Sequence, residues 1–347
     1  GVCSRFEGDH FVVCTEEDDE YAKEITDKIR SELKTYPIDM NVEVSCGIYH
    51  VHGRDKSINI MCDRAHIAVN SIKGNYARHV AVYDDSHREA IIHSQLIVSE
   101  MNRAMEQRQF HVYLQPKFNM ETEKIIGAEA LVRWVHPERG ILPPGDFIPI
   151  FEHNGFIGQL DLYMFEETCK VLRRWLDGGR QPVPVSVNLS RVGFYNPKLC
   201  EHLYKTAQKY RLPLDLLELE VTETAYASDS RTIHSHIRQL RRMGFKILMD
   251  DFGNGYSSLN MLSSTNIDIL KMDMRFMEGE GLKSLGILDA ILHMSKWLNL
   301  PVIAEGVNRE QHVKTLRSVG CVYGQGFYYY RPMNTEEFEH LLLTPGK

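Results

Sequence analysis

Acidic and amide side chains recur within or directly after apolar runs in the second part of the chain. Together with one lysine they are Glu129, Asn188, Glu220, Asp250, Asp251, Lys271 and Glu305. Several carboxylates in one confined site repel one another unless cations neutralise them, and an all-oxygen set with one amide favours Mg²⁺ or Mn²⁺. A pair of such ions activates water and holds the attacking and leaving oxygens of a phosphoryl transfer. The residue types therefore predict metal-dependent hydrolysis of a phosphate ester.

Simpler roles stay open for each of these residues. Any one acid or amide could cap the N-terminus of the helix that follows its strand. Lys271, which would supply a fixed positive charge to a phosphoryl transition state, could also pair with a neighbouring acid. Adjacent Asp250 and Asp251 point to opposite faces of an extended strand, so both reach one site only where the strand breaks. The following Phe252-Gly253-Asn254-Gly255 predicts such a break.

The apolar runs that carry these residues alternate with amphipathic helical stretches. Eight strands are predicted over residues 111–116, 125–134, 183–189, 216–221, 246–249, 267–272, 301–304 and 322–328. Strand–helix alternation predicts a parallel sheet, and eight such units predict an α/β fold of the closed (β/α)8 TIM-barrel type. Only residues 119–124 connect the first two strands, so these two are expected to be antiparallel. The carboxyl ends of the strands would gather the polar residues at one mouth.

The segment before the barrel predicts a small, separate α/β unit. Strand-like runs cover residues 11–14, 42–49 and 80–83, and a helical stretch covers 18–33. We therefore expect a partial α/β domain over 1–85, a connecting helix over 86–109 and the barrel over 110–347.

Composition limits the partners and the compartment. The 347 residues carry a formal net charge of −7, which indicates no surface for a DNA or RNA polymer. The seven cysteines contain no Cys-x-x-Cys pair and are typical of reduced thiols. No apolar run reaches about 18 residues, so we expect no membrane insertion by this segment. The reduced thiols lead us to expect a cytoplasmic protein. Because the sequence begins without Met, it could also be the cytoplasmic part of a longer, membrane-anchored protein.

The barrel region resembles the EAL-domain family of cyclic di-GMP phosphodiesterases, over about residues 95–345. The naming tripeptide stands as Glu129-Ala130-Leu131. Further motifs agree in order and spacing, namely YLQP at 113–116, VNLS at 187–190, EVTE at 220–223, DDFGNGYSSL at 250–259, LKMD at 270–273, AEGV at 304–307 and GQGF at 324–327. The resemblance implies a barrel with one antiparallel strand and metal-dependent hydrolysis of cyclic di-GMP to linear pGpG in bacterial second-messenger signalling.

The resemblance also implies roles in holding two Mg²⁺ or Mn²⁺ ions and in catalysis. The implied ligands of the first ion are Glu129, Asn188, Glu220 and Asp250. Asp250 would bridge to the second ion, with Asp251 beside it. Lys271 resembles the residue that orients the attacking water and the phosphate. Glu305 is similar to the family's essential Glu, described either as the general base or as a ligand of the second ion.

Other residues are implied in substrate binding and support. Gln115, Leu131 and Arg133 would hold the dinucleotide, and Gln325 would complete the shell around the second ion and contact the substrate. Arg133 would bind a phosphate by charge-assisted hydrogen bonds, unless it forms a structural ion pair. Glu223 resembles the Glu that holds the loop after the two aspartates. The expected partners are cyclic di-GMP and a second copy of the chain, in a homodimer through the barrel.

Three positions depart from the family pattern without replacing an expected ligand. They are Asn254, Asn308 and Val322. They leave open how well the loop after the two aspartates is ordered and how the pocket is built beside the second ion. The sequence thus leaves three functions open. The first is an active phosphodiesterase, the second a slow or catalytically silent cyclic di-GMP receptor that acts through protein partners, and the third an unrelated metal-dependent barrel hydrolase.

The segment Glu7-Gly8-Asp9-His10-Phe11 resembles a degenerate signature of the GGDEF, or diguanylate cyclase, family. His10 replaces an acid that would hold Mg²⁺. Glu7 replaces a glycine whose missing side chain lets GTP approach. We therefore expect a role in packing or regulation, and no cyclase activity.

Overall fold

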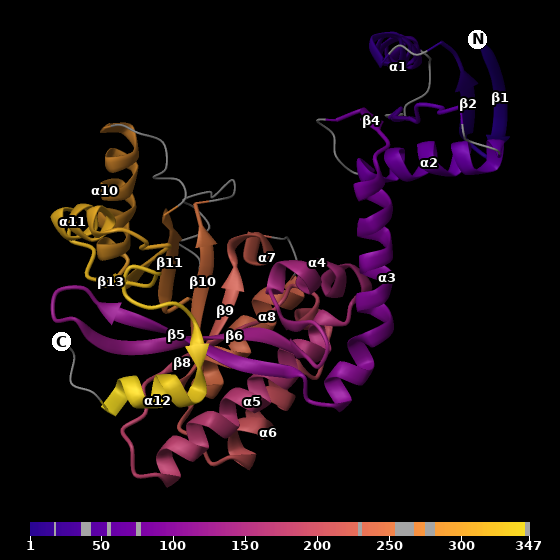
Figure 1. Cartoon of the computed structure of the whole chain (residues 1–347). Helices are drawn as coiled ribbons and strands as arrows, with labels where there is room; N and C mark the ends of the chain where they lie inside the picture. The colour runs from indigo at the N-terminus through magenta and orange to yellow at the C-terminus, as the bar shows by residue number, and fades with distance from the viewer. Residues whose placement is uncertain are drawn as a thin grey trace. The chain divides into compact units, whose positions relative to one another are not determined.

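The computed structural model describes residues 1–16, 19–35, 43–53, 57–73, 78–227, 231–253, 267–274 and 282–343. The chain divides into two compact units, Gly1–Ser99 and Glu100–Lys347 (Figure 1). The boundary lies within the long helix α3 (Asp85–Glu106), which covers most of the range predicted for a connecting helix. The division into a partial GGDEF-like domain, a linker helix and a barrel domain stays a prediction.

In its described residues, the first unit contains two small sheets and, apart from α3, two helices. Strands β1 (Val2–Glu7) and β2 (His10–Cys14) form an antiparallel hairpin. The remaining elements are α1 (Asp19–Lys34), β3 (Cys46–Ile48), α2 (Ile58–Ser71) and β4 (Val80–Val82), and β3 pairs with β4 in parallel. The GGDEF-like segment spans the hairpin turn. The sequence did not predict β1 or α2, and β3 is shorter than the strand predicted over 42–49.

Eight strands of the second unit close into the predicted barrel. They are β5 (Phe110–Asn119), β6 (Lys124–His136), β8 (Val185–Asn188), β9 (Leu217–Thr222), β10 (Lys246–Phe252), β11 (Ile269–Asp273), β12 (Val302–Glu305) and β13 (Tyr323–Gly324). The barrel closes because β5 pairs with both β6 and β13. Both pairings of β5 are antiparallel, whereas the pairings from β6 round to β13 are parallel. The predicted barrel with one antiparallel strand is confirmed.

The last barrel strand is much shorter than the strand predicted over 322–328. After Gly324 the chain crosses over Val307, which donates a hydrogen bond from its nitrogen to the Gln325 carbonyl (3.1 Å) and accepts one from Tyr328 N (3.0 Å). At Gly326 an added Cβ would lie 2.3 Å from the Val307 carbonyl oxygen, so only glycine permits this approach. This crossing ends the strand and forms one wall of the pocket described below.

Helices surround the barrel, as Figure 1 shows, and two short strands extend its sheet. The helices are α4 (Pro144–Asn154), α5 (Ile157–Asp177), α6 (Leu199–Lys209), α7 (Glu223–Ala227), α8 (Arg231–Met243), α10 (Leu282–Trp297), α11 (Glu310–Ser318) and α12 (Thr335–Leu343). Strand β7 (Gly140–Leu142) pairs with β6, and β14 (Met333–Asn334) pairs with β5. Trp175 of α5 stacks on Phe338 of α12 with ring centroids 5.6 Å apart, which fixes the last helix to the barrel. Within the described ranges, no helix has the length and apolar character needed to cross a bilayer.

A buried acid on α5 holds the loop that follows β8. Asp161 Oδ2 accepts hydrogen bonds from Ser190 N (2.8 Å) and Ser190 Oγ (2.6 Å). Ser190 Oγ in turn accepts one from Gly193 N (3.1 Å). Burial raises the pKa of Asp161 to about 7 despite the bonds from Ser190. The folded chain therefore holds the Asp161 proton more tightly than the unfolded chain does.

We expect the buried Asp161 carboxyl group to lower the stability of the barrel as the pH rises. Between the unfolded pKa near 4 and the folded pKa near 7, the folded state binds more protons, so the free energy of unfolding falls with increasing pH. The loss should be about 2 kcal/mol between pH 5 and 7. Asp161→Asn keeps an oxygen acceptor for Ser190 and should remove this loss, as measured by urea unfolding at both pH values. The exposed Asp215→Asn serves as the control; an Asp161→Asn variant with the parent's pH dependence would contradict the assignment.

Candidate active site

The strand order of the barrel places the predicted polar residues at one mouth. Asn188 ends β8 and is the register partner of Glu220 on β9, and Glu129 on β6 is the register partner of Ser186. Glu305 ends β12, and Gln325 directly follows β13. Parallel neighbours end at the same rim, which brings side chains from distant parts of the sequence together.

Lys271 of β11 lies at the centre of four of the predicted acids. Its Nζ lies 3.2 Å from Glu129 Oε2, 3.3 Å from Asp250 Oδ1 and 2.5 Å from Glu305 Oε1, and it also contacts Glu220 Oε2. The Lys271 side chain is only 1% exposed. The salt-bridge role that the sequence left open for Lys271 is therefore present, with four partners.

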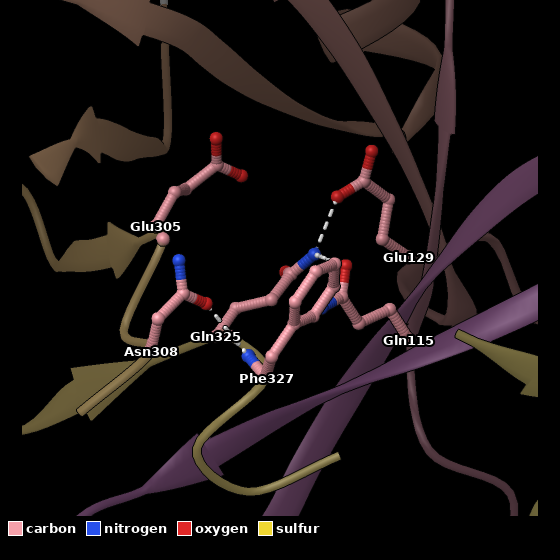
Figure 2. A pocket seen from close by; sticks show the side chains of 8 residues that line it. Gln115, Glu129, Glu305, Asn308, Gln325 and Phe327 are labelled. Atoms are coloured by element: carbon pink, nitrogen blue, oxygen red, sulfur yellow. Dashed lines mark hydrogen bonds between the residues drawn. The ribbon is translucent and has the colours of Figure 1, made fainter. Parts of the chain in front are cut away.

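Glu129 joins this cluster to two amides. Asn188 Nδ2 donates a hydrogen bond to Glu129 Oε1 (2.9 Å), and Gln325 Nε2 donates one to Glu129 Oε2 (2.6 Å). Gln325 Nε2 also donates to Gln115 Oε1 (3.1 Å), and Gln115 on β5 is the register partner of Glu129 on β6. Figure 2 shows the hydrogen bonds of Gln325 to Glu129 and Gln115, with the Glu129 and Glu305 carboxylates on opposite sides of the pocket.

The charges in the cluster shift one another's protonation. Burial alone would raise the pKa of Glu129, but the Lys271 and Lys117 ammonium groups lower it to about 2. The pKa of Glu220 is raised to about 7 by burial and by the Glu129 charge. The pKa of Glu305 is raised well above its ordinary value by burial and by the charge of Asp250, against the opposing effect of Lys271. The two lysines thus keep only part of the acid set ionised.

The chemistry of the donor set fits a hard divalent cation. Two ammonium groups, of Lys117 and Lys271, face five carboxylates, those of Glu129, Glu218, Glu220, Asp250 and Glu305. Carboxyl groups thus outnumber ammonium groups in the cluster, and their oxygens are the ligands that a hard cation prefers. In the described part of the chain, no group of three or more His, Cys, Asp or Glu side chains is already arranged to hold a metal ion, because these carboxylates turn toward lysine.

The strand break expected at the two aspartates is present. Asp251 has a left-handed backbone with φ of 57°, and the register with β11 shifts between Met249 and Phe252. Asp250 Oδ1 accepts a hydrogen bond from Asp251 N (2.9 Å). Buried Glu223 accepts one from Gly253 N (2.9 Å), so it contacts the segment that the sequence predicted it to support.

A cavity of about 190 Å³ opens beside the cluster. It is lined by Gln115, Glu129, Glu305, Gly306, Asn308, Gln325, Gly326 and Phe327. Asn308 Oδ1 accepts a hydrogen bond from Phe327 N (3.1 Å), so this departure from the family pattern ties the two loops of the pocket wall together (Figure 2). The carbonyl of Val322, another departure, accepts a hydrogen bond from Met120 N (2.7 Å). Asn254, the third, lies outside the described residues.

Leu131 and Arg133 do not line this cavity. They follow Glu129 at alternate positions of β6 and therefore share its face of the strand. The Arg133 guanidinium carbon lies 5.7 Å from the centre of the Tyr113 ring, and Arg133 Nη1 donates to the Val132 carbonyl (2.8 Å). Among the described residues Arg133 forms no salt bridge, which argues against a structural ion pair in that part of the chain.

Three buried residues below the cluster were missed from the sequence. Lys117 of β5 lies 2.7 Å from Ser186 Oγ and 3.0 Å from Glu218 Oε2, and it also reaches Glu220 (3.3 Å). Two signals in the sequence could have identified Lys117 and Glu218. Lys117 is a charged residue in an otherwise buried strand, and Glu218 stands two residues before Glu220, on the same face of β9.

Two curated relatives match nearly the whole length of the chain. YkoW, a signaling protein of Bacillus subtilis, is 32% identical over 355 residues, which span 99% of this chain and 44% of that protein. MucR of Pseudomonas aeruginosa, a bifunctional diguanylate cyclase/cyclic di-GMP phosphodiesterase, is 31% identical over 342 residues, which span 96% of this chain and 50% of that protein. The chain thus spans about half the length of the curated relatives it matches.

Solved structures match the second unit. The PaMucR phosphodiesterase in complex with c-di-GMP is 36% identical and superposes with a TM-score of 0.67, covering 70% of this chain and 99% of that one. The family model for the EAL domain matches residues 98–332, which include every residue predicted for the site. The barrel, the mouth and this match together establish that the chain belongs to the EAL domain family.

Proposed function

We propose that this chain hydrolyses one phosphodiester bond of cyclic di-GMP and releases linear pGpG, with two Mg²⁺ or Mn²⁺ ions held at the barrel mouth. The observation that carries the proposal is the cluster of four carboxylates around Lys271 beside an open cavity. The PaMucR phosphodiesterase, a similar structure, binds the same dinucleotide.

The residues that would hold the ions are Glu129, Asn188, Glu220, Asp250 and Asp251. The ions would supply positive charge to the attacking and leaving oxygens of the phosphate. Lys271 would orient the phosphate from the centre of the cluster, and Glu305 in the pocket wall would accept the proton of the attacking water. Glu223 would support the loop after the aspartates through its bond to Gly253.

The dinucleotide would be held by side chains of the pocket and of the adjoining face of β6. Gln115 and Gln325 meet in the pocket wall, and Leu131 and Arg133 extend along the strand beside Glu129. The guanidinium of Arg133, which makes no salt bridge with the described residues, would bind a phosphate by charge-assisted hydrogen bonds.

We also propose that residues 1–85 are a degenerate GGDEF-like domain that serves packing or regulation. Two observations support this. Residues Glu7 to Phe11 span a hairpin turn, and the similarity to MucR, a bifunctional cyclase and phosphodiesterase, extends over 96% of the chain. A cytoplasmic location and a homodimer through the barrel stay predictions.

The competing function is a cyclic di-GMP receptor without turnover. The observation that favours it is Asn308, a departure from the family pattern that lines the pocket and bonds to the opposite loop. Incubating the chain with cyclic di-GMP and Mn²⁺ separates the two functions, because a receptor binds the dinucleotide and forms no linear product.

Replacing Glu129 by Gln should nearly abolish product formation. The substitution keeps the size of the side chain and an acceptor for Asn188, but it removes one carboxylate of the cluster. We expect a loss larger than the 10–100-fold typical of supporting residues, measured as pGpG formed at saturating substrate and Mn²⁺. Glu201→Gln, on the exposed face of α6, is the matched control. Full activity in Glu129→Gln would refute its assignment as a ligand.

Replacing Arg133 by Ala should weaken substrate binding and leave the fold intact. Loss of a charge-assisted hydrogen bond to a phosphate costs about 1.5–3 kcal/mol, so KM should rise by about tenfold or more while kcat changes little. Steady-state kinetics over a range of cyclic di-GMP concentrations give both values. Arg238→Ala, on the exposed face of α8, is the control. An unchanged KM would limit Arg133 to packing on Tyr113.

A further inference from the structure

A second charged layer lies inside the barrel, below the carboxylates that surround Lys271. It consists of Lys117, Ser186 and Glu218, each at most 5% exposed. Barrel interiors are usually filled by branched apolar side chains, and a buried ion pair must offset the loss of hydration of both charges. Packing alone therefore does not explain why charged residues stand in this layer.

Glu220 connects this layer to the mouth of the barrel. Its Oε1 lies 3.3 Å from Lys117 Nζ, while its Oε2 contacts Lys271 Nζ. Each oxygen of this carboxylate thus has its own lysine, one from below and one from above. The two contacts fix the plane of the carboxylate, because rotation about its last bond would break both of them.

Lys117 is itself held in place by partners on two other strands. Ser186 Oγ on β8 and Glu218 Oε2 on β9 lie 2.7 and 3.0 Å from its Nζ. Glu218 alone would balance the charge of Lys117. The approach to Glu220 is therefore additional to what charge balance requires.

We propose that Lys117 is a positioning residue that holds one oxygen of Glu220 from below, so that the other oxygen faces the barrel mouth. The inference rests on the proposed function, since the positioning serves the metal-holding role of Glu220. Outer-shell partners of ligating carboxylates typically change metal affinity 10–100-fold. Lys117 does not line the cavity, so it acts through the carboxylates of the cluster, by its contact with Glu220 and by its charge on Glu129.

The test is a titration of the whole chain with Mn²⁺, in which electron paramagnetic resonance measures the free ion. The variants are Lys117→Met and the double variant Lys117→Met/Glu218→Gln. We expect both to bind Mn²⁺ at least about tenfold more weakly than the parent. Thermal unfolding without metal is the second readout. Lys117→Met leaves Glu218 as an unpaired buried charge, whereas the double variant leaves none, so the double variant should regain the midpoint lost in Lys117→Met.

The double variant separates positioning from a purely structural role. If Lys117 served only to balance Glu218, the double variant would bind Mn²⁺ as tightly as the parent, and that result would overturn the inference. If Lys117→Met alone does not fold, the double variant still tests the positioning role, because it leaves no unpaired charge at position 218. Lys205→Met, which removes an exposed lysine paired with Glu201 on α6, should leave Mn²⁺ affinity unchanged. A parent chain that binds no Mn²⁺ would overturn the proposed function and this inference with it.

Discussion

The structure of the mouth depends on one ammonium group buried among carboxylates. Lys271 contacts acids from β6, β9, β10 and β12, so a single side chain ties together strands whose residues lie up to 142 positions away in sequence. Removing a buried charge from such a cluster leaves its partners uncompensated, which is far more costly than losing a surface pair. Lys271 thus holds the acids together in one site. Carboxyl groups still outnumber ammonium groups there, so a cation would add the positive charge that the site lacks.

The reversed strand β5 gives this site its second source of charge. Alternate residues of β5 share one face, so Gln115 lines the pocket and Lys117, two residues on, lies in the layer below. Both side chains meet residues of the parallel strands. Strand β9 does the same with Glu220 and Glu218, so the two layers are joined through two strands.

The sequence predicted the architecture well because barrel strands leave a local signal. Apolar runs ending in polar residues marked Asn188, Asp250 and Glu305, and the short connection before β6 revealed the antiparallel pair. What it missed depends on contacts between distant residues. Lys117 meets Glu218 across 101 positions. Helix α2 has apolar residues on several sides and therefore no single stripe that predicts it. Which of the acids stay ionised depends on their distances to two lysines, and the spacing of residues in the sequence does not reveal those distances.

The crossing of the chain over Val307 also limits how the pocket can diverge among relatives. Because a side chain at position 326 would collide with the backbone, the path of this wall is fixed, and variation there is confined to the side chains that project from it. Asn308 and Phe327 are two of these, and they are linked by a hydrogen bond. A change at position 308 alters the support of residue 327 as well. Because the bond comes from the backbone nitrogen of Phe327, the side chain at 327 can change without losing this support, whereas the side chain at 308 cannot.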